Sequence, residues 1–212
     1  MNFATRQDAG AKLGAYLAGQ HLGAEVILGL PRGGVIVATE VATLLGLPLD
    51  AINVRKIGHP RFREFAVGAL AENEITVLDG AAIAKSRVND AELQAVIAEE
   101  KSRLEIHERQ FHAPVRPALE NRTVLIVDDG LATGSTMEAA VLSVKKSRAR
   151  TVFVAIPVAS ESGVERIERV ADRVMALIID PAFDAVGHYY EHFNQTTDEE
   201  AIAAINPPAT TP

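Results

Sequence analysis

The chain has 212 residues, a net charge of −7 and no cysteine. This length is sufficient for one α/β domain with a full core, and an apolar fraction of 48% excludes a disordered or fibrous protein. The negative charge argues against a general binder of nucleic acids or anionic membranes, and the lack of cysteine excludes disulfide bonds and thiolate zinc sites. Because the first residues have no apolar signal core and no apolar run approaches the length of a membrane span, we expect a cytoplasmic protein.

Hydrophobic periodicity predicts helices and buried strands that alternate along the chain. The first predicted helix covers residues 6–19 and begins after Thr5, with Asp8 at the spacing of a capping box. A polar loop is predicted over 57–64, followed by a hairpin of strands 65–70 and 75–78. The other predicted helices cover 35–45, 90–112, 161–170 and 198–205, with one more from Met137, and the other predicted strands cover 25–30, 49–54, 123–127, 151–156 and 173–179.

Continuous apolar strands that alternate with helices predict a doubly wound, mostly parallel sheet with helices on both faces. We expect a single domain over residues 1–205, an irregular aromatic segment over 180–197 and a disordered tail over 206–212. The predicted helix over 90–112 is capped by Asn89 and has one apolar stripe, and we interpret its charged face as solvated.

The most informative stretch covers residues 124–136, where a buried strand ends in two acids and a small, hydroxyl-rich loop leads into a helix. Carboxylates such as Asp128 and Asp129 can hold the neighbouring hydroxyls of a sugar and can help bind Mg²⁺. Gly134 would let the backbone approach a phosphate, and the start of the following helix offers N–H groups to it. Taken separately, the acids and hydroxyls would be ordinary turn and helix caps, but their combination predicts a ribose 5-phosphate site.

Two common nucleotide-binding motifs do not fit this chain. A P-loop requires Gly-Lys-Ser or Gly-Lys-Thr, whereas Gly134 is followed by Ser135 with no lysine. The glycines over residues 29–34 do not have the spacing of the dinucleotide motif GxGxxG. Both alternatives are therefore excluded on residue identity.

The run Val-Asp-Asp-Gly-Leu-Ala-Thr-Gly-Ser-Thr over 127–136 closely resembles the signature of type I phosphoribosyltransferases, which bind phosphoribosyl pyrophosphate (PRPP). The resemblance covers about residues 25–180 and implies the fold of that family. Compared with compact members, the helix over 90–112 is an insertion that could cap the site or make a dimer. The resemblance implies that ribose 5-phosphate is bound by Asp128, Asp129, Gly130, Ala132, Thr133, Gly134, Ser135 and Thr136.

A second segment, over residues 29–34, lies where the family binds pyrophosphate. Backbone N–H groups of Gly33 and Gly34 and the guanidinium of Arg32 suit oxygen anions, although a plain strand-to-helix turn also favours glycine. Since the carboxyl ends of parallel strands meet at one edge of a sheet, we expect this turn and the acidic pair to converge there.

A third segment follows the strand predicted over 49–54. By their position in the family, Arg55 and Lys56 face the pyrophosphate, and they are the predicted catalytic residues together with Asp129, the candidate general base. The loop that follows corresponds to the mobile lid of the family, which would exclude water from the reaction. A solvated basic loop is an equal alternative. The predicted lid residues are His59, Arg61 and Arg63.

The aromatic segment over 180–197 occupies the position where the family has a hood over the acceptor base. Aromatic rings there could stack on a planar ligand, or could pack in the core or against a subunit. The candidate acceptor residues are Asp180, Phe183, Tyr189 and Tyr190. The same segment has the pattern H-x-x-E-H in residues 188–192, which we interpret as a chance match to a zinc-peptidase motif.

The resemblance implies a reaction in which the 5-phosphoribosyl group of Mg²⁺-bound PRPP moves to a nitrogen nucleophile, commonly a nucleobase, and pyrophosphate is released. Asp128 and Asp129 would hold Mg²⁺ indirectly or together with PRPP. It also implies a role in nucleotide and nucleoside metabolism and favours a homodimer, with no nucleic-acid or membrane partner. The alternative is a non-catalytic regulator that binds PRPP, but the turn at Arg32 favours catalysis.

Overall fold

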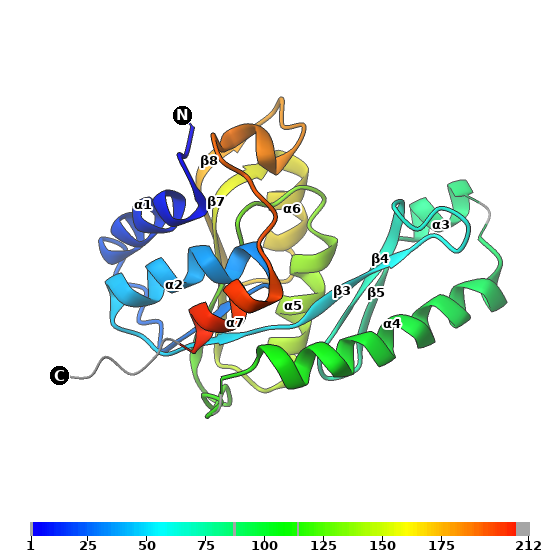
Figure 1. The fold of residues 1–212 in the computed structure, drawn as a ribbon, viewed down its shortest axis with the longest axis horizontal. Coiled ribbons are helices and arrows are strands. Elements are labelled where there is room, and N and C mark those ends of the chain that lie inside the picture. Colours follow the sequence, from blue (N-terminus) through cyan, green and yellow to red (C-terminus); the bar gives the residue numbers. More distant parts are fainter. Residues whose placement is uncertain (1, 87, 114, 207–212) are drawn as a thin grey trace.

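The computed structural model describes residues 2–86, 88–113 and 115–206, so that the predicted disordered tail lies outside the described residues except for Asn206. The central sheet has five parallel strands in the order β2-β1-β6-β7-β8 (Figure 1). This arrangement confirms the predicted doubly wound, parallel sheet. Its strands are β1 (Val26–Gly29), β2 (Leu49–Ala51), β6 (Thr123–Val127), β7 (Thr151–Ser160) and β8 (Arg173–Asp180).

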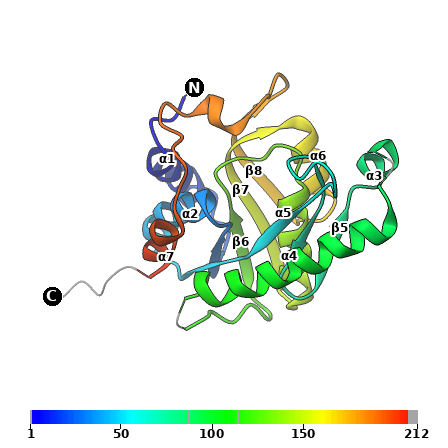
Figure 2. The ribbon, with the colours of Figure 1, turned by 45° about the vertical axis from the view of Figure 1, so that its right-hand side comes forward.

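Helices cover both faces of this sheet because successive residues of each strand point to opposite sides. Ile27 and Leu125 pack against α1 and α2, whereas Leu28 and Ile126 pack against α5 on the other face. Figure 2 shows the sheet between these two helical layers. No helix in the described ranges is both long and apolar enough to cross a bilayer. The helices are α1 (Arg6–Ala18), α2 (Gly33–Leu45), α5 (Ser135–Lys146) and α6 (Glu161–Glu168).

A second, antiparallel sheet projects from the central sheet together with a long helix, and we call residues 54–111 the arm (Figure 1). Its strands pack against the long helix through Ile57, Val67 and Leu70, and against α5 through small alanine side chains. The predicted hairpin and the predicted long helix are confirmed. The arm comprises β3 (Val54–Gly58), β4 (Ala66–Ala71), β5 (Ile75–Leu78), α3 (Gly80–Ser86) and α4 (Asp90–Phe111).

The prediction of one strand over 49–54 followed by a loop over 57–64 is wrong. β2 ends at Ala51, and the chain then enters the second sheet as β3, which continues to Gly58. The change of sheet is held by Glu72, whose Oε1 accepts hydrogen bonds from the backbone N–H and the side-chain amide of Asn53 at 2.8 and 2.9 Å. The short helix α3 was also not predicted, because none of its residues is buried and it has no apolar stripe.

The carboxyl end of α4 is tied to the place where the chain changes sheet. His112 lies between two buried acids, with Nδ1 at 3.2 Å from Asp50 Oδ2 and Nε2 at 3.1 Å from Glu72 Oε1. Arg116 bridges the same acids from outside, at 3.2 and 3.0 Å. This charged cluster fixes the arm to the edge of the central sheet.

The chain returns to the central sheet at β6 and ends in a segment that crosses the molecule. After β8, a short 3-10 helix η1 (Val186–Tyr189) is the only helical turn described in the predicted irregular segment over 180–197. Residues 191–197 then pass α1 and α2 to reach α7 (Asp198–Ile205), which lies beside α2 and the end of α4 (Figure 1).

Candidate functional site

The glycine turn after β1 and the acidic pair after β6 lie directly against each other at the carboxyl end of the central sheet. β1 and β6 are neighbours, and their last residues, Gly29 and Val127, are paired in register. A Cβ on Gly34 would lie 2.5 Å from Asp128 Oδ1, and a Cβ on Gly33 would collide with the Asp129 carboxylate. Only glycine allows the turn to approach the acids this closely.

Asp129 is held by groups from two distant parts of the chain. Arg6 donates a hydrogen bond from Nε to Asp129 Oδ2 over 2.7 Å. The same guanidinium donates from Nη1 to the carbonyl of Asn194 over 2.7 Å and lies 3.8 Å from the centre of the Phe193 ring. The Tyr190 hydroxyl donates to the backbone carbonyl of Asp129 over 2.6 Å. The beginning of α1 and the segment after η1 therefore meet at this acid.

The two acids carry charge in a place where water solvates it poorly. Burial raises the pKa of Asp128 well above its ordinary value, and the adjacent charge of Asp129 raises it further. Burial also raises the pKa of Asp129, although the hydrogen bond and the charge of Arg6 act in the opposite direction. The charge of Lys56 counteracts the shift at Asp128. A ligand that donates hydrogen bonds to these carboxylates would stabilise their charged form.

The loop between β6 and α5 is fixed at Leu131. The N–H of this buried residue donates to the carbonyl of Val158 over 2.9 Å, and its carbonyl accepts from the N–H of Ser160, also over 2.9 Å. The hydroxyl of Ser160 donates to the carbonyl of Ala132 over 2.6 Å. The end of β7 therefore holds the predicted phosphate loop in one shape. Gly130 lies at the start of this loop, against the Val186 side chain.

The end of the loop opens into α5. Gly134 precedes this helix with φ at +79°, a conformation that favours glycine, and no described side chain caps the helix. Thr133 is exposed, and Ser135 and Thr136 are partly exposed on the first turn of α5. Because the first N–H groups of a helix lack intrahelical acceptors and carry a partial positive charge, this end suits a phosphate.

Arg166 of α6 adds a cation beside this loop. Its Nη1 lies 3.4 Å from the carbonyl of Thr133, and its Nε donates to Glu138 on α5. Thr133, Arg166 and Arg169 are among the residues that line a cleft at this position. Arg166 therefore lies beside the predicted 5-phosphate region, where its charge is paired with that of Glu138.

The predicted catalytic residues Arg55 and Lys56 lie in different surroundings. Lys56 is exposed on β3 and acts electrostatically on Asp128. Arg55 instead donates from Nε to Glu100 Oε2 on α4 over 2.6 Å, and its Nη1 is 3.3 Å from His107 Nε2. The charge of Lys56 thus lowers the pKa of Asp128, while Arg55 is bound by α4.

Arg32, which was predicted to bind pyrophosphate, also pairs with an acidic side chain. Its Nη1 lies 3.5 Å from Asp198 Oδ1 at the start of α7, and both side chains are partly exposed. His107 lies next to Arg55, and its pKa is lowered chiefly by burial and then by the charge of Arg55, while the charge of Asp198 acts in the opposite direction. Two basic residues expected to bind anions are therefore held by carboxylates of α7 and α4.

The charged face of α4 is not simply solvated, so that interpretation is wrong for its middle. Glu100 is 7% exposed and pairs with Arg55 and Arg103. Glu99 accepts a hydrogen bond from Arg63 at 2.8 Å. Acids of α4 therefore hold β3 and the loop after it.

The predicted lid residues lie within the arm, and their two arginines pair with acids of α4. His59 is 5% exposed, and its Nδ1 accepts the backbone N–H of Arg61 at 3.0 Å. Arg61 Nη2 lies 3.3 Å from Glu92 Oε1, and Arg63 pairs with Glu99, so both arginines reach acids of α4. The structure does not bring these residues to the acidic pair.

The aromatic candidates divide into two groups. Tyr190 is 6% exposed and packs with Phe3 in the core, with ring centres 5.4 Å apart. Phe183 and Tyr189 stack on each other with ring centres 5.5 Å apart, and the Tyr189 hydroxyl donates to Asp180 Oδ2 over 2.6 Å. Tyr190 is therefore a support for Asp129, whereas the other three remain at the surface of the segment.

The sequence matches a known family over most of its length. The family model described as "Phosphoribosyl transferase domain" matches residues 5–191. The chain belongs to the phosphoribosyltransferase family. The match covers the glycine turn, the acidic pair and the aromatic segment as far as residue 191, and thus most of the described chain.

Individual relatives agree with this assignment. A protein of Mycobacterium tuberculosis named "Putative phosphoribosyl transferase" is 40% identical over 207 residues, which are 96% of this chain and 46% of that protein. The chain thus spans about half the length of this relative. A ribose-phosphate pyrophosphokinase of Pyrococcus furiosus is 31% identical over 164 residues, 68% of this chain and 58% of that protein. The crystal structure of TT1426 from Thermus thermophilus is 44% identical with a TM-score of 0.77, covering 97% of this chain and 98% of that chain.

Two residues beside the candidate site were not found from the sequence. Arg6 and Arg166 are lone arginines on amphipathic helices, and no spacing distinguishes them from solvated charges. Tyr190 was predicted as an acceptor residue, whereas the structure places its hydroxyl on the backbone of Asp129. Arg6 follows the Thr5 cap directly and is therefore the first residue of α1. Because α1 begins beside Asp129, its first side chain reaches that acid.

The H-x-x-E-H pattern does not form a helical pair of histidines. η1 ends at Tyr189, so His188 and His192 do not share the face of one α-helix. His188 Nδ1 instead lies 3.4 Å from Asp184 Oδ2. Among the described residues of this chain, no group of three or more His, Asp or Glu side chains is placed to hold a metal ion.

Proposed function

We propose that this chain is an enzyme that transfers the 5-phosphoribosyl group of PRPP to a nitrogen nucleophile and releases pyrophosphate. The observation that carries this proposal is the close approach of the Gly33-Gly34 turn to Asp128 and Asp129, beside the uncapped start of α5. A diol site, a phosphate site and a turn suited to diphosphate thus adjoin each other, as PRPP would require. Cytoplasmic location, a homodimer and a role in nucleotide and nucleoside metabolism stay predictions.

The proposed roles follow from the position of each residue. Asp128 and Asp129 accept hydrogen bonds from the ribose hydroxyls, and the loop from Gly130 to Thr136 binds the 5-phosphate. Arg32, Gly33, Gly34 and Lys56 stabilise the departing pyrophosphate. Catalysis by such a site rests on positioning and on electrostatic stabilisation of the leaving group. Asp129 is the candidate base that takes a proton from the attacking nitrogen.

Mg²⁺ fits this site in the company of a diphosphate. Asp129 Oδ2 accepts from Arg6, and Asp128 Oδ1 accepts the backbone N–H of Asp129 at 2.8 Å, so each carboxylate has one other oxygen to offer. Two carboxylate oxygens do not make a protein cage, but Mg²⁺ commonly takes one or two carboxylates and completes its octahedron with phosphates and water. When bound, Mg²⁺ would neutralise charge on the pyrophosphate.

The acceptor is proposed to bind beneath the segment over 180–197. Phe183 and Tyr189 offer a stacked aromatic pair, and Asp180 offers a carboxylate beside it. Aromatic faces and a few polar groups suit a planar nitrogen heterocycle, so a nucleobase is the proposed acceptor class. Tyr190 is left out of this role because its ring is buried.

The decisive experiment is a measurement of pyrophosphate release from PRPP and Mg²⁺ across a panel of purines, pyrimidines and small amines. Release with one member of the panel, and with formation of its ribonucleoside 5′-phosphate, supports the proposal. Tight PRPP binding without release across the panel would favour the non-catalytic regulator. Asp128→Asn with Asp129→Asn should abolish both binding and release in a folded protein, and unchanged PRPP affinity in this variant would contradict the ribose assignment.

A further inference from the structure

We propose that Arg6 is a positioning residue that fixes the Asp129 carboxylate for the ribose hydroxyls and links it to the segment after η1. This inference rests on the proposed function, because it assigns a role within the PRPP site. No motif points to Arg6, which lies 123 residues from Asp129 in the sequence.

The geometry around Arg6 leaves its guanidinium little freedom. Nε donates to Asp129 Oδ2 and Nη1 donates to the carbonyl of Asn194, both over 2.7 Å. The Phe193 ring lies against the guanidinium, with its centre 3.8 Å from Cζ. The planar fork of arginine is suited to serve two acceptors at once while stacking on a ring. One carboxylate oxygen of Asp129 is thereby fixed, and the carboxylate plane with it.

Burial distinguishes this pair from an ordinary surface ion pair. The side chains of Arg6 and Asp129 are only 11% and 16% exposed, whereas the Lys12–Asp8 pair further along α1 is 39% and 31% exposed. Removing one partner of a buried pair leaves the other charge without compensation, which has a much larger effect than loss of a surface pair. Here the uncompensated group would be an acid of the proposed ribose site, next to a second acid.

Arg6 also adjoins the turn proposed for pyrophosphate. A Cβ on Gly33 would lie 2.6 Å from Arg6 Nε. The guanidinium therefore belongs to the wall that the glycine turn and the acidic pair share. Because its charge is matched by Asp129, we expect it to act through that acid and to have little direct effect on pyrophosphate.

The opposite role, in which Arg6 competes with the ligand for Asp129, predicts an effect of the opposite sign. If the ion pair had to break for ribose to bind, removal of the guanidinium would tighten binding. If the ion pair fixes the acid, removal weakens binding. The sign of the change in ribose 5-phosphate affinity therefore separates the two roles.

The test is a double-mutant cycle with Arg6→Gln and Asp129→Asn, in which calorimetry measures the affinity for ribose 5-phosphate and, separately, for pyrophosphate without Mg²⁺. Arg6→Gln should weaken ribose 5-phosphate binding by about tenfold or more. Its affinity for metal-free pyrophosphate should stay within about twofold of wild type, because Arg6 acts through Asp129, which is proposed to reach pyrophosphate only through the metal ion. In the Asp129→Asn background, adding Arg6→Gln should cause no further loss. Additive losses, wild-type affinity or tighter binding would each overturn the proposal.

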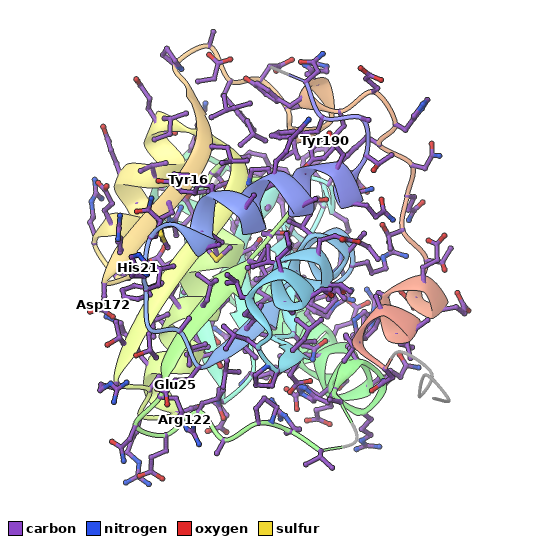
Figure 3. The ribbon with its side chains drawn as sticks, turned by 90° about the vertical axis from the view of Figure 1, so that its left-hand side faces the viewer. Tyr16, His21, Glu25, Arg122, Asp172 and Tyr190 are labelled. Carbon is purple, nitrogen blue, oxygen red and sulfur yellow. The ribbon has the colours of Figure 1, made fainter. Side chains whose placement is uncertain are left out.

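Arg122→Gln is the matched control. Arg122 also pairs with an acid, Glu25, at 3.0 Å, but these two residues lie at the end of the molecule opposite Tyr190 (Figure 3). This variant should bind both ligands as wild type does. If Arg6→Gln fails to fold, Arg6→Lys carries the test, because an ammonium keeps the charge but lacks the planar fork that spans Asp129 and Asn194 and stacks on Phe193. We then expect about a threefold loss for ribose 5-phosphate alone, and equal affinity would overturn the inference.

The wild-type protein separates failure of this inference from failure of the proposed function. Wild-type protein that binds neither PRPP nor ribose 5-phosphate would contradict the proposed function itself. Wild-type protein that binds both ligands, with Arg6→Gln unaffected, would leave the proposed function in place and contradict only the role of Arg6.

Discussion

Asp128 and Asp129 bring two carboxylates together where burial makes each charge unfavourable. Burial and the charge of Asp129 raise the pKa of Asp128 well above its ordinary value, and the charges of Lys56 and Arg6 offset this only in part. Asp129 also has a direct hydrogen bond from Arg6, so the charge of Asp128 is the less well compensated of the two. A buried, poorly compensated charge of this kind destabilises the fold, and such groups persist where they are needed for binding or catalysis. The consequence can be measured separately from activity.

We expect Asp128→Asn to stabilise the protein while it weakens PRPP binding. The amide oxygen can still accept the N–H of Asp129, and the buried charge is removed, so the free energy of unfolding should rise on the order of 1 kcal/mol. Urea denaturation at neutral pH measures this change. Asp184→Asn is the control, since its side chain is 82% exposed and its loss should leave stability unchanged. A destabilised Asp128→Asn protein would contradict the expectation.

Arg32 and Asp198 allow a second prediction at this scale. Arg32→Ala should weaken pyrophosphate binding more than ribose 5-phosphate binding, because the guanidinium adjoins the glycine turn and not the acids. Asp198→Asn should strengthen pyrophosphate binding by roughly twofold to fivefold, as an exposed ion pair no longer competes for the guanidinium. Calorimetry with pyrophosphate and Mg²⁺ measures both effects. Equal losses of both ligands in Arg32→Ala would contradict the assignment.

The sequence identified those site residues whose signal is local. Asp128, Asp129 and Gly134 share one short segment, and residue type and order are enough to predict their chemistry. Arg6 could not be found this way, because its contact with Asp129 depends on how α1 meets the end of β6. Arg55 was named from the sequence, but its pairing with Glu100 was not predicted, because Glu100 was expected to be solvated.

Among the elements, α4 depends on charge at its carboxyl end. Burial lowers the pKa of His112, but hydrogen bonds and charges of Asp50 and Glu72 outweigh it and raise the pKa to about 9. The pKa values of both acids are lowered, against the effect of burial, by His112 and by backbone N–H groups. Arg116 and Asn53 complete the surroundings of the imidazole. This cluster joins α4, β2 and the end of β4.

The anchoring cluster predicts a specific loss of stability at alkaline pH. Because the pKa of His112 is raised above its ordinary value of 6.5 to about 9, its contribution is fully present below pH 6.5 and is lost as the pH rises through 9. The total change is up to about 3 kcal/mol. Urea denaturation between pH 7 and pH 10 should show this fall in wild type. His112→Gln should be less stable at pH 7 and should lack the fall, and parallel pH profiles would contradict the role of His112.

The helices and strands that could be predicted from the sequence are those with a clear hydrophobic periodicity or a clear cap. The strands of the central sheet and the helix α4 have long apolar patterns or clear caps, and the side chain of Asn89 accepts from Ala91 and Glu92 as expected of a cap. The change of sheet after Ala51 has no such pattern, since Ala51 and Ile52 are both apolar and no turn residue separates them. It depends on Asn53 and Glu72, which are 19 residues apart.

In the whole molecule, the proposed site lies where the central sheet, the arm and the final segment meet. The central sheet supplies the acids and the glycine turn, the arm supplies Lys56, and α7 supplies Asp198. Helices α4 and α7 lie beside each other at this junction (Figure 1). Because charged side chains of all three parts lie near this junction, binding of an anion should weaken ion pairs between them, such as the pair of Arg32 with Asp198.

Arg6 and Tyr190 have one more consequence, because they tie the first helix and the segment after η1 to a single acid. Binding of ribose 5-phosphate at Asp129 is then linked to local unfolding of both segments, since a ligand stabilises the state in which they are docked. Hydrogen exchange should slow in the first turn of α1 and over residues 190–197 when ribose 5-phosphate binds, although neither segment is expected to cover the 5-phosphate. Unchanged exchange there, with slower exchange in the phosphate loop, would show that the two ends respond independently of the ligand.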